Sequence, residues 1–99
     1  MTNAREVVET LRIPAAHPAL PGHFPGNPIV PGVVLLDRIA AALERADGAR
    51  LARIDAVKFL APLRPDEEAE LHIVRDGTRV RFRIDRADLP ILRGEGELA

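Results

Sequence analysis

The stretch HPALPGHFPGNPIVPG, from His17 to Gly32, constrains the fold of this chain more than any other part of the sequence. It holds three glycines and, counting Pro14 just before it, six prolines. Each proline fixes its own φ, lacks an N–H and drives the preceding residue towards an extended conformation. The stretch is therefore incompatible with a helix or a central strand, and we predict a stiff loop that holds side chains in place.

The residues that follow this loop predict one long helix. Pro31 and Gly32 lead directly into VVLLDRIAAALERA, and proline is favoured in a first helical turn because its missing N–H costs nothing there. From Val33 to Leu43 the sequence is apolar nearly all round, which is typical of a helix buried on most sides. Gly48 is a natural end for this helix.

Five other segments have the composition of strands. In TRVRFRIDR, apolar and arginine side chains alternate, which predicts a strand with one buried face. An Asp-Gly pair before it predicts a hairpin turn, and prolines at 62 and 65 separate two earlier strands. We therefore predict one α+β domain over residues 1–99, with an antiparallel curved sheet of about five strands around the helix. The predicted strands are Glu6–Ile13, Leu51–Leu60, Glu67–Arg75, Thr78–Arg86 and Ile91–Leu98.

Length and charge narrow the classes of function. A chain of 99 residues holds one small domain, and domains of this size are often stabilised by oligomerisation. The net charge of −1 and the three scattered phenylalanines argue against nucleic-acid binding. The absence of cysteine excludes disulfides and thiol nucleophiles. The polar start and the lack of a long apolar run predict no signal peptide and no membrane span, so we expect a cytoplasmic protein.

Asp37 stands within the apolar part of the predicted helix. A buried carboxylate is costly unless it is paired or protonated, and a protonated carboxyl group is able to act as a general acid. Periodicity alone leaves two interpretations open. Asp37 is either such an acid, or it lies on an exposed stripe or pairs with Arg38, Arg45 or a strand arginine.

His23 lies in the middle of the stiff loop. Histidine is the usual general base near pH 7, and a stiff loop positions a side chain better than a flexible one. The alternative is a loop histidine that only hydrogen-bonds the backbone. Gly32 lies at the helix start, where unpaired N–H groups favour a partial negative charge. A base, an acid and an oxyanion donor are therefore candidates for one site.

His17 and His72 are weaker candidates. His17 is close to His23, and it either orders the loop or lines the site. His72 is in phase with two glutamates of its predicted strand, so we expect it on a solvated face. The spacing of His17, His23 and Asp37 matches no metal motif. The chain has no serine and no phosphate-binding glycine loop, which excludes a Ser-His-Asp triad.

The stretch GHFPGNPIVPGVVLLD resembles the signature of the 3-hydroxyacyl-acyl-carrier-protein dehydratases, the hotdog-fold enzymes of fatty-acid synthesis. VKFLAPLRPDEEAEL resembles the passage between the family's second and third strands, and the likeness covers roughly residues 15–98. The stretch is most similar to small dehydratase-like proteins of polyketide-type and aryl-polyene clusters. Some of these work as unequal pairs in which one partner is not catalytic.

This resemblance implies a hotdog fold and a role for each motif residue. His23 matches the histidine that removes the C2 proton, Asp37 the helix carboxylate that protonates the leaving hydroxyl, and Gly32 the N–H that polarises the thioester carbonyl. In the family, the histidine and the acid face each other across a dimer interface. The implied reaction converts a (3R)-3-hydroxyacyl thioester to a trans-2-enoyl thioester without a metal or redox cofactor. The expected substrate-binding residues are His17, Phe24, Pro31, Val33, Leu36 and Phe59.

The implied partners are a second subunit and a substrate carrier. The subunit is a second copy or a related dehydratase, in a dimer or a higher oligomer, and the carrier is acyl carrier protein or coenzyme A. Acyl carrier protein is acidic, so its docking site should be basic, and Arg50, Arg53, Lys58 and Arg64 are candidates. Two alternatives stay open: a thioesterase on the same fold, and a non-catalytic acyl-thioester-binding subunit of a heterodimer.

Overall fold

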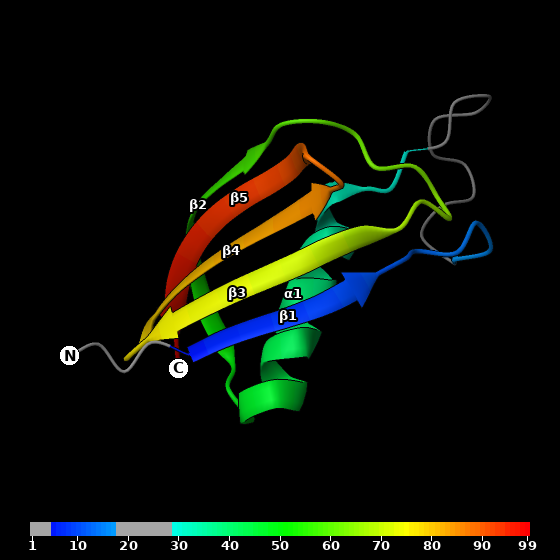
Figure 1. Cartoon of the computed structure of the whole chain (residues 1–99). Helices are drawn as coiled ribbons and strands as arrows, with labels where there is room; N and C mark the ends of the chain where they lie inside the picture. Colours follow the sequence, from blue (N-terminus) through cyan, green and yellow to red (C-terminus); the bar gives the residue numbers. More distant parts are fainter. Residues whose placement is uncertain (1–4, 18–28) are drawn as a thin grey trace.

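The computed structural model of the chain describes residues 5–17 and 29–99, which form five strands and one helix (Figure 1). The ends of all five predicted strands agree with the observed ends to within two residues. The elements are β1 (Arg5–Leu11), α1 (Gly32–Asp47), β2 (Leu51–Phe59), β3 (Ala69–Asp76), β4 (Arg79–Arg86) and β5 (Leu89–Leu98).

The strands form one antiparallel sheet in the order β1-β3-β4-β5-β2, and the sheet curves around α1 (Figure 1). β3, β4 and β5 follow one another as a meander, as predicted. The turn between β3 and β4 contains Gly77 at a φ of 61°, a conformation that glycine adopts without a Cβ clash. The predicted α+β arrangement, a hotdog fold, is confirmed, with β1 and β2 at the two edges.

α1 begins after Pro31 and ends at Gly48, as the sequence predicts. The prediction that the helix is buried on most sides is wrong for the single chain, because the sheet covers only one side of it. Val33 is 63% exposed, and Asp37, one turn later, is also exposed. The buried side carries Val34, Leu35, Ile39, Ala42 and Leu43.

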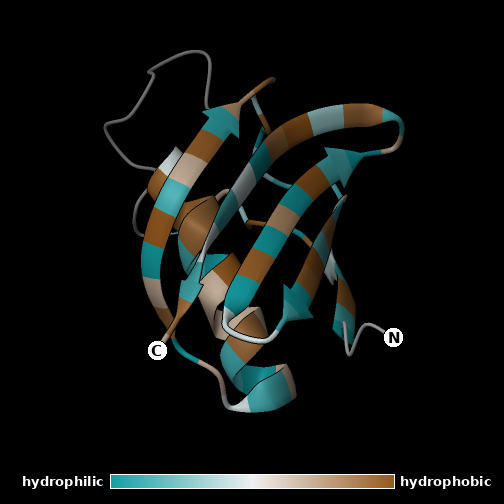
Figure 2. Ribbon diagram, turned by 90° about the vertical axis from the view of Figure 1, so that its left-hand side faces the viewer, coloured by the Kyte–Doolittle hydropathy of each residue, from teal (hydrophilic) through white to brown (hydrophobic). Residues whose placement is uncertain are grey.

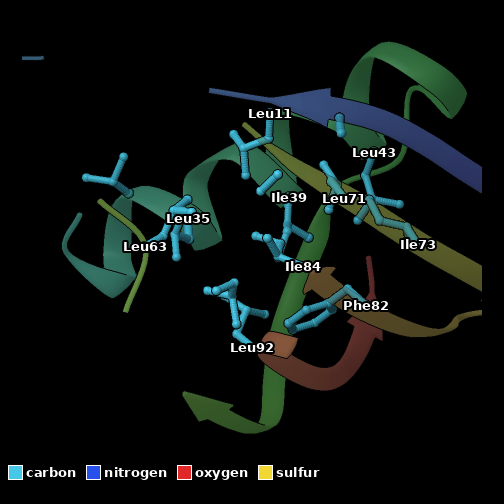
Figure 3. Packing of buried hydrophobic residues seen from close by; sticks show 14 of the residues in the cluster. Leu11, Leu35, Ile39, Leu43, Leu63, Leu71, Ile73, Phe82, Ile84 and Leu92 are labelled. Carbon is cyan, nitrogen blue, oxygen red and sulfur yellow. The ribbon is translucent and has the colours of Figure 1, made fainter. Parts of the chain in front are cut away.

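The core fills the space between α1 and the concave face of the sheet (Figure 3). Along β4, Val80, Phe82 and Ile84 are buried, while the arginines between them are exposed. This confirms the predicted alternation, which also appears as teal and brown bands along the strands in Figure 2. Full burial of each such side chain contributes about 1.5–3 kcal/mol, so the inner face fixes the register of the strands.

Backbone hydrogen bonds hold the segment before α1 against the segment after β2. The Val30 N–H donates to the Leu63 carbonyl at 2.8 Å, and the Leu60 N–H donates to the Ile91 carbonyl at 2.8 Å. The first bond brings the start of the helix beside a stretch that lies about thirty residues later, and the second holds that stretch against β5. α1 is not long and apolar enough to cross a membrane, within the part of the chain that the structure describes.

Candidate active site

A groove with a volume of about 370 Å³ opens at the N-terminal end of α1, and we call it the helix-start groove. Its walls come from three segments: the residues before α1, the first turn of α1, and the residues from the end of β2 onwards. All of its side chains are apolar, which suits an acyl chain. The lining residues are Ile29, Val30, Pro31, Gly32, Leu35, Phe59, Leu60, Ala61, Pro62 and Leu63.

Gly32 is the first residue of α1 and lines this groove. The first N–H groups of a helix have no acceptor within the helix, and Pro31 at the cap position has no side-chain oxygen to supply one. The first turn also holds no acidic residue. The helix dipole and these N–H groups therefore favour a partial negative charge beside Gly32.

The ring of Phe59 packs directly on Gly32. A Cβ added to Gly32 would lie 2.5 Å from both Cε1 and Cζ of that ring, so a larger residue displaces Phe59. Phe59 is 53% exposed, and its ring forms the outer wall of the groove. The close approach explains physically why glycine stands at this position.

Asp37 lies on α1, on the same side of the helix as Val33. It is exposed, and within the described part of the chain it makes no hydrogen bond or ion pair. The interpretation that Asp37 pairs with Arg45 is wrong, since Arg45 binds Glu9 at 2.6 Å. The single chain therefore offers an uncovered carboxyl group beside the exposed apolar side chain of Val33.

The structure brings only some of the predicted site residues together. Pro31, Gly32 and Phe59 share the helix-start groove, whereas Val33 and the half-buried Leu36 lie on α1 outside its lining. His17 is half-buried in the turn after β1, where its N–H donates to the Pro14 carbonyl at 2.9 Å. His23 and Phe24 lie outside the described residues. The convergence of His23, Gly32 and Asp37 therefore stays a prediction.

Sequence reasoning missed the far wall of the groove. That wall is the segment from Leu60 to Leu63, which the bond between Val30 and Leu63 holds beside the helix start. A signal for it exists in the sequence. The apolar residues LAPL follow β2 directly and stop at a charged arginine, and such an apolar run indicates a segment that packs against another apolar surface.

Other titratable groups in the described residues give no second site of this kind. No three His, Asp or Glu side chains of residues 5–17 and 29–99 are grouped to hold a metal ion. His72 lies on the outer face of the sheet, as predicted, but its side chain is only 15% exposed. Its Nε2 is hydrogen-bonded to Glu70 at 2.6 Å, and the side chain is more covered than expected.

Residues 1–94 match the model of the ApeI-like family, described as ApeI dehydratase. Among curated proteins, the 3-hydroxyacyl-[acyl-carrier-protein] dehydratase FabZ of Rhizobium rhizogenes is 35% identical over 85 residues, covering 74% of this chain and 54% of the relative. FabZ of Lactobacillus helveticus is 37% identical over 67 residues, covering 59% of this chain and 45% of the relative. The chain thus spans about half the length of the curated relatives it matches.

Solved structures share the fold. A chain of the dehydratase heterocomplex ApeI:P from Xenorhabdus doucetiae is 28% identical, with a TM-score of 0.84 over 95% of this chain and 87% of that one. A variant of the fluoroacetyl-CoA-specific thioesterase FlK has a TM-score of 0.72 over 100% of this chain and 87% of that one. At 15% identity, this second likeness shows the fold alone. By the match over residues 1–94, the chain belongs to the ApeI-like dehydratase family.

Proposed function

We propose that the chain removes water from (3R)-3-hydroxyacyl thioesters to give trans-2-enoyl thioesters. The observation that carries the proposal is the helix-start groove. It places the N-terminal end of α1, at Gly32, beside an apolar wall, in a chain that matches a dehydratase family over residues 1–94. A thioester carbonyl at Gly32 would meet an N–H donor, while its acyl chain would lie along apolar side chains.

The reaction then follows from three groups. The imidazole of His23 takes the proton from C2, and the electron pair moves towards the thioester carbonyl, whose oxygen gains negative charge. The Gly32 N–H stabilises that charge. As the double bond forms between C2 and C3, the C3–O bond breaks, and the carboxyl group of Asp37 gives its proton to the leaving hydroxyl to form water. General acid and base steps of this kind are worth about 10²–10⁴-fold each.

A second subunit completes the site in this proposal. Asp37 must be covered to stay protonated near neutral pH, and in the single chain it is exposed. Large apolar side chains are also exposed at the start of the helix and in the groove beside it: Val33 is 63% exposed, Phe59 53% and Leu60 48%. Burial of this surface against a second copy or a related dehydratase would cover Asp37 and bring it to the partner's His23. Edge strand β2 has a free side available for the same contact.

The proposal is tested by measuring dehydration of a 3-hydroxyacyl thioester by the purified protein, alone and with the variants His23→Ala and Asp37→Asn. Loss of about 10²–10⁴-fold in turnover is expected for each variant. Glu44→Gln is the matched control for Asp37→Asn, because Glu44 is an exposed carboxylate on the same helix. Wild-type turnover in both site variants would contradict the proposed roles.

One alternative has a specific observation in its favour. The structure titled as the ApeI:P heterocomplex is similar over 95% of this chain, so a role as one half of an unequal pair is the second candidate. In that case the purified chain alone would be inert but would bind the acyl thioester, and activity would appear when a related dehydratase subunit is added. The substrate is carried on the phosphopantetheine of acyl carrier protein or on coenzyme A.

A further inference from the structure

Cross-strand neighbours on the outer face of the sheet form rows of very different charge. In one row, Asp76, Arg79, Glu97 and Arg53 stand opposite one another on β3, β4, β5 and β2, so acid and base alternate. We call this the alternating row. In another row on the same four strands, the residues are His72, Arg83, Arg93 and Lys58. We call this the basic row, because it holds no acid.

Both arginines of the alternating row are paired with acids of the sheet, either Glu97 of the row or the neighbouring Asp55. Arg79 binds Asp55 at 2.6 Å and Glu97 at 2.8 Å, and Arg53 binds Asp55 at 2.5 Å. Hydrogen bonds from Arg53 and Arg79 lower the pKa of Asp55, which shows how well the charges match. Arg53 is thereby excluded from the basic docking patch that the sequence suggested. The positive charges of this row are therefore balanced within the sheet.

The positive charges of the basic row are not all paired with acids of the described residues. Arg83 stands opposite Arg93, and Arg93 stands opposite Lys58, although like charges directly opposite one another destabilise a sheet. Arg83 is paired with Asp85 at 3.0 Å and His72 with Glu70 at 2.6 Å. Arg93 and Lys58 are exposed and have no ion pair within residues 5–17 and 29–99. The excess positive charge therefore centres on Arg93 and Lys58.

The surface under this row is hollowed. A depression of about 680 Å³ on the outer face is lined by His72 and three arginines, and by two acidic residues, of which Asp85 pairs with Arg83. The arginines are Arg81, Arg83 and Arg93, and the second acid is Asp88. Four strands about 4.8 Å apart give the row a length of about 14 Å, longer than a single phosphate group can bridge. An acidic helix with carboxylates at positions i, i+4, i+7 and i+10 spans about 15 Å, close to this length.

We propose that the basic row is the docking surface for the acidic protein that presents the acyl thioester, an inference that rests on the proposed function. Charge complementarity selects an acidic partner, and the length of the row selects a helix-sized acidic surface. The position of Lys58 connects the basic row with the helix-start groove. Lys58 directly precedes Phe59, the wall of the helix-start groove, so the row reaches the strand that borders the proposed site.

The test is the dissociation constant of acyl carrier protein bearing phosphopantetheine but no acyl group, measured by calorimetry at low salt. Arg93→Glu should raise the constant at least tenfold, and added salt should weaken wild-type binding. The matched control is Arg12→Glu. It changes the net charge equally at an arginine that is 58% exposed beyond the end of β1. Its dissociation constant should stay within about twofold of the wild-type value, as expected for a charge outside the interface.

Thermal unfolding shows whether Arg93→Glu is folded. It should unfold no earlier than wild type, because a glutamate at 93 stands between Arg83 and Lys58. Carrier binding by Arg93→Glu equal to wild type would overturn the docking inference and leave the proposed function intact. If Arg93→Glu bound coenzyme A more weakly than wild type but bound the carrier protein equally well, the docking inference would also be overturned. If the wild-type protein had no dehydratase activity but still bound the carrier protein more tightly than Arg93→Glu does, the proposed function would be refuted and the docking inference would stand.

Discussion

The two ends of α1 differ in the partners that the protein supplies for their backbone groups and charges. At the C-terminal end, Gly48 adopts a left-handed conformation with a φ of 64°, and its N–H donates to the Glu44 carbonyl at 2.9 Å. The side chain of Asp47 is only 2% exposed, and it pairs with Arg5 at 3.2 Å and Arg75 at 3.4 Å. A carboxylate is unfavourable at a helix C-terminus, so these two arginines offset both the dipole and the burial.

At the N-terminal end, residues 5–17 and 29–99 supply no side-chain partner of this kind. Pro31 offers no side-chain oxygen, although its carbonyl accepts from the Val34 N–H at 3.0 Å. Gly32 borders the apolar groove, and Val33 is 63% exposed. The carboxylate on this half of the helix, Asp37, is also exposed and unpaired within the described residues. The difference indicates that the C-terminal end serves stability, whereas the N-terminal end is completed by a substrate and a second subunit.

Among changes at the two helix ends themselves, the largest effect is expected from Gly32→Ala. The added Cβ meets the Phe59 ring at 2.5 Å, and because that ring is half-exposed it should swing aside into the groove. Displacement of a positioned group by about 1 Å costs about 10²-fold in rate, so kcat/KM should fall by about that factor. The melting temperature should change little, since the ring can move without opening the core.

A double variant sharpens this prediction. Gly32→Ala with Phe59→Ala removes the clash, and its kcat/KM should exceed that of Gly32→Ala alone. A merely structural role for Gly32 would instead show as a lowered melting temperature that tracks the loss of activity. Wild-type kcat/KM in Gly32→Ala would contradict the placement of the thioester at the helix start.

At the other end of the helix, Asp47→Asn should affect stability alone. The change removes a charge held by two arginines, which are 67% and 32% exposed, so the free energy of unfolding should fall by about 1–2 kcal/mol. Urea unfolding measures it, with Asp88→Asn in an exposed turn as the control. Lower turnover per folded molecule would show that the C-terminal end also serves the chemistry.

Gly48→Ala should have a smaller effect at the same end. Alanine at a φ of 64° costs about 1 kcal/mol, because its Cβ is disfavoured in the left-handed region, although nothing lies within 4 Å of that Cβ. The melting temperature should fall by a few degrees, as differential scanning calorimetry measures. An unchanged melting temperature would mean that the last turn of α1 contributes little to the fold.

Local signals explain what the sequence could predict. The alternation in β4, the Asp-Gly turn before it, and Pro31 and Gly48 at the ends of α1 each depend on a few adjacent residues. The side of α1 that the sheet covers was not predictable in the same way. Asp37 lies in an apolar stretch, but its exposure depends on how far the sheet curves around the helix.

The long-range features escaped prediction for the same reason. Lys58 and Arg93 become neighbours only through the pairing of β2 with β5, in which two register shifts precede them. Asp47 is covered by arginines from β1 and β3. The sequence predicted Gly32 and Phe59 as residues of the candidate site, but only the structure shows that they are in contact.

The smallest effect concerns Glu97 and Asp55 on the outer face of the sheet, which, like Asp47, are paired with arginines of the chain. A hydrogen bond from Thr78 and then Arg79 lowers the pKa of Glu97, and bonds from Arg53 and then Arg79 lower that of Asp55. A lowered pKa in the folded state gives stability that is present above the ordinary carboxyl range. It is lost as pH falls through the folded pKa.

The double variant Asp55→Asn with Glu97→Gln tests this pH dependence. Its deficit in unfolding free energy at pH 7 should shrink as pH falls below about 4, where the wild-type carboxylates become protonated. Urea unfolding at pH 7 and pH 3 measures the two deficits. Equal deficits at both values would mean that the ion pairs do not stabilise the sheet.

The central claim is that the N-terminal end of α1 adds or removes water at C3 of an acyl thioester. Incubation of a trans-2-enoyl pantetheine thioester with the protein in H₂¹⁸O, followed by mass spectrometry, tests it most directly. The account predicts ¹⁸O on C3 of an intact 3-hydroxyacyl thioester, and no incorporation with Asp37→Asn. The appearance of ¹⁸O in a released carboxylic acid, with the thioester cleaved, would contradict the account and indicate a thioesterase.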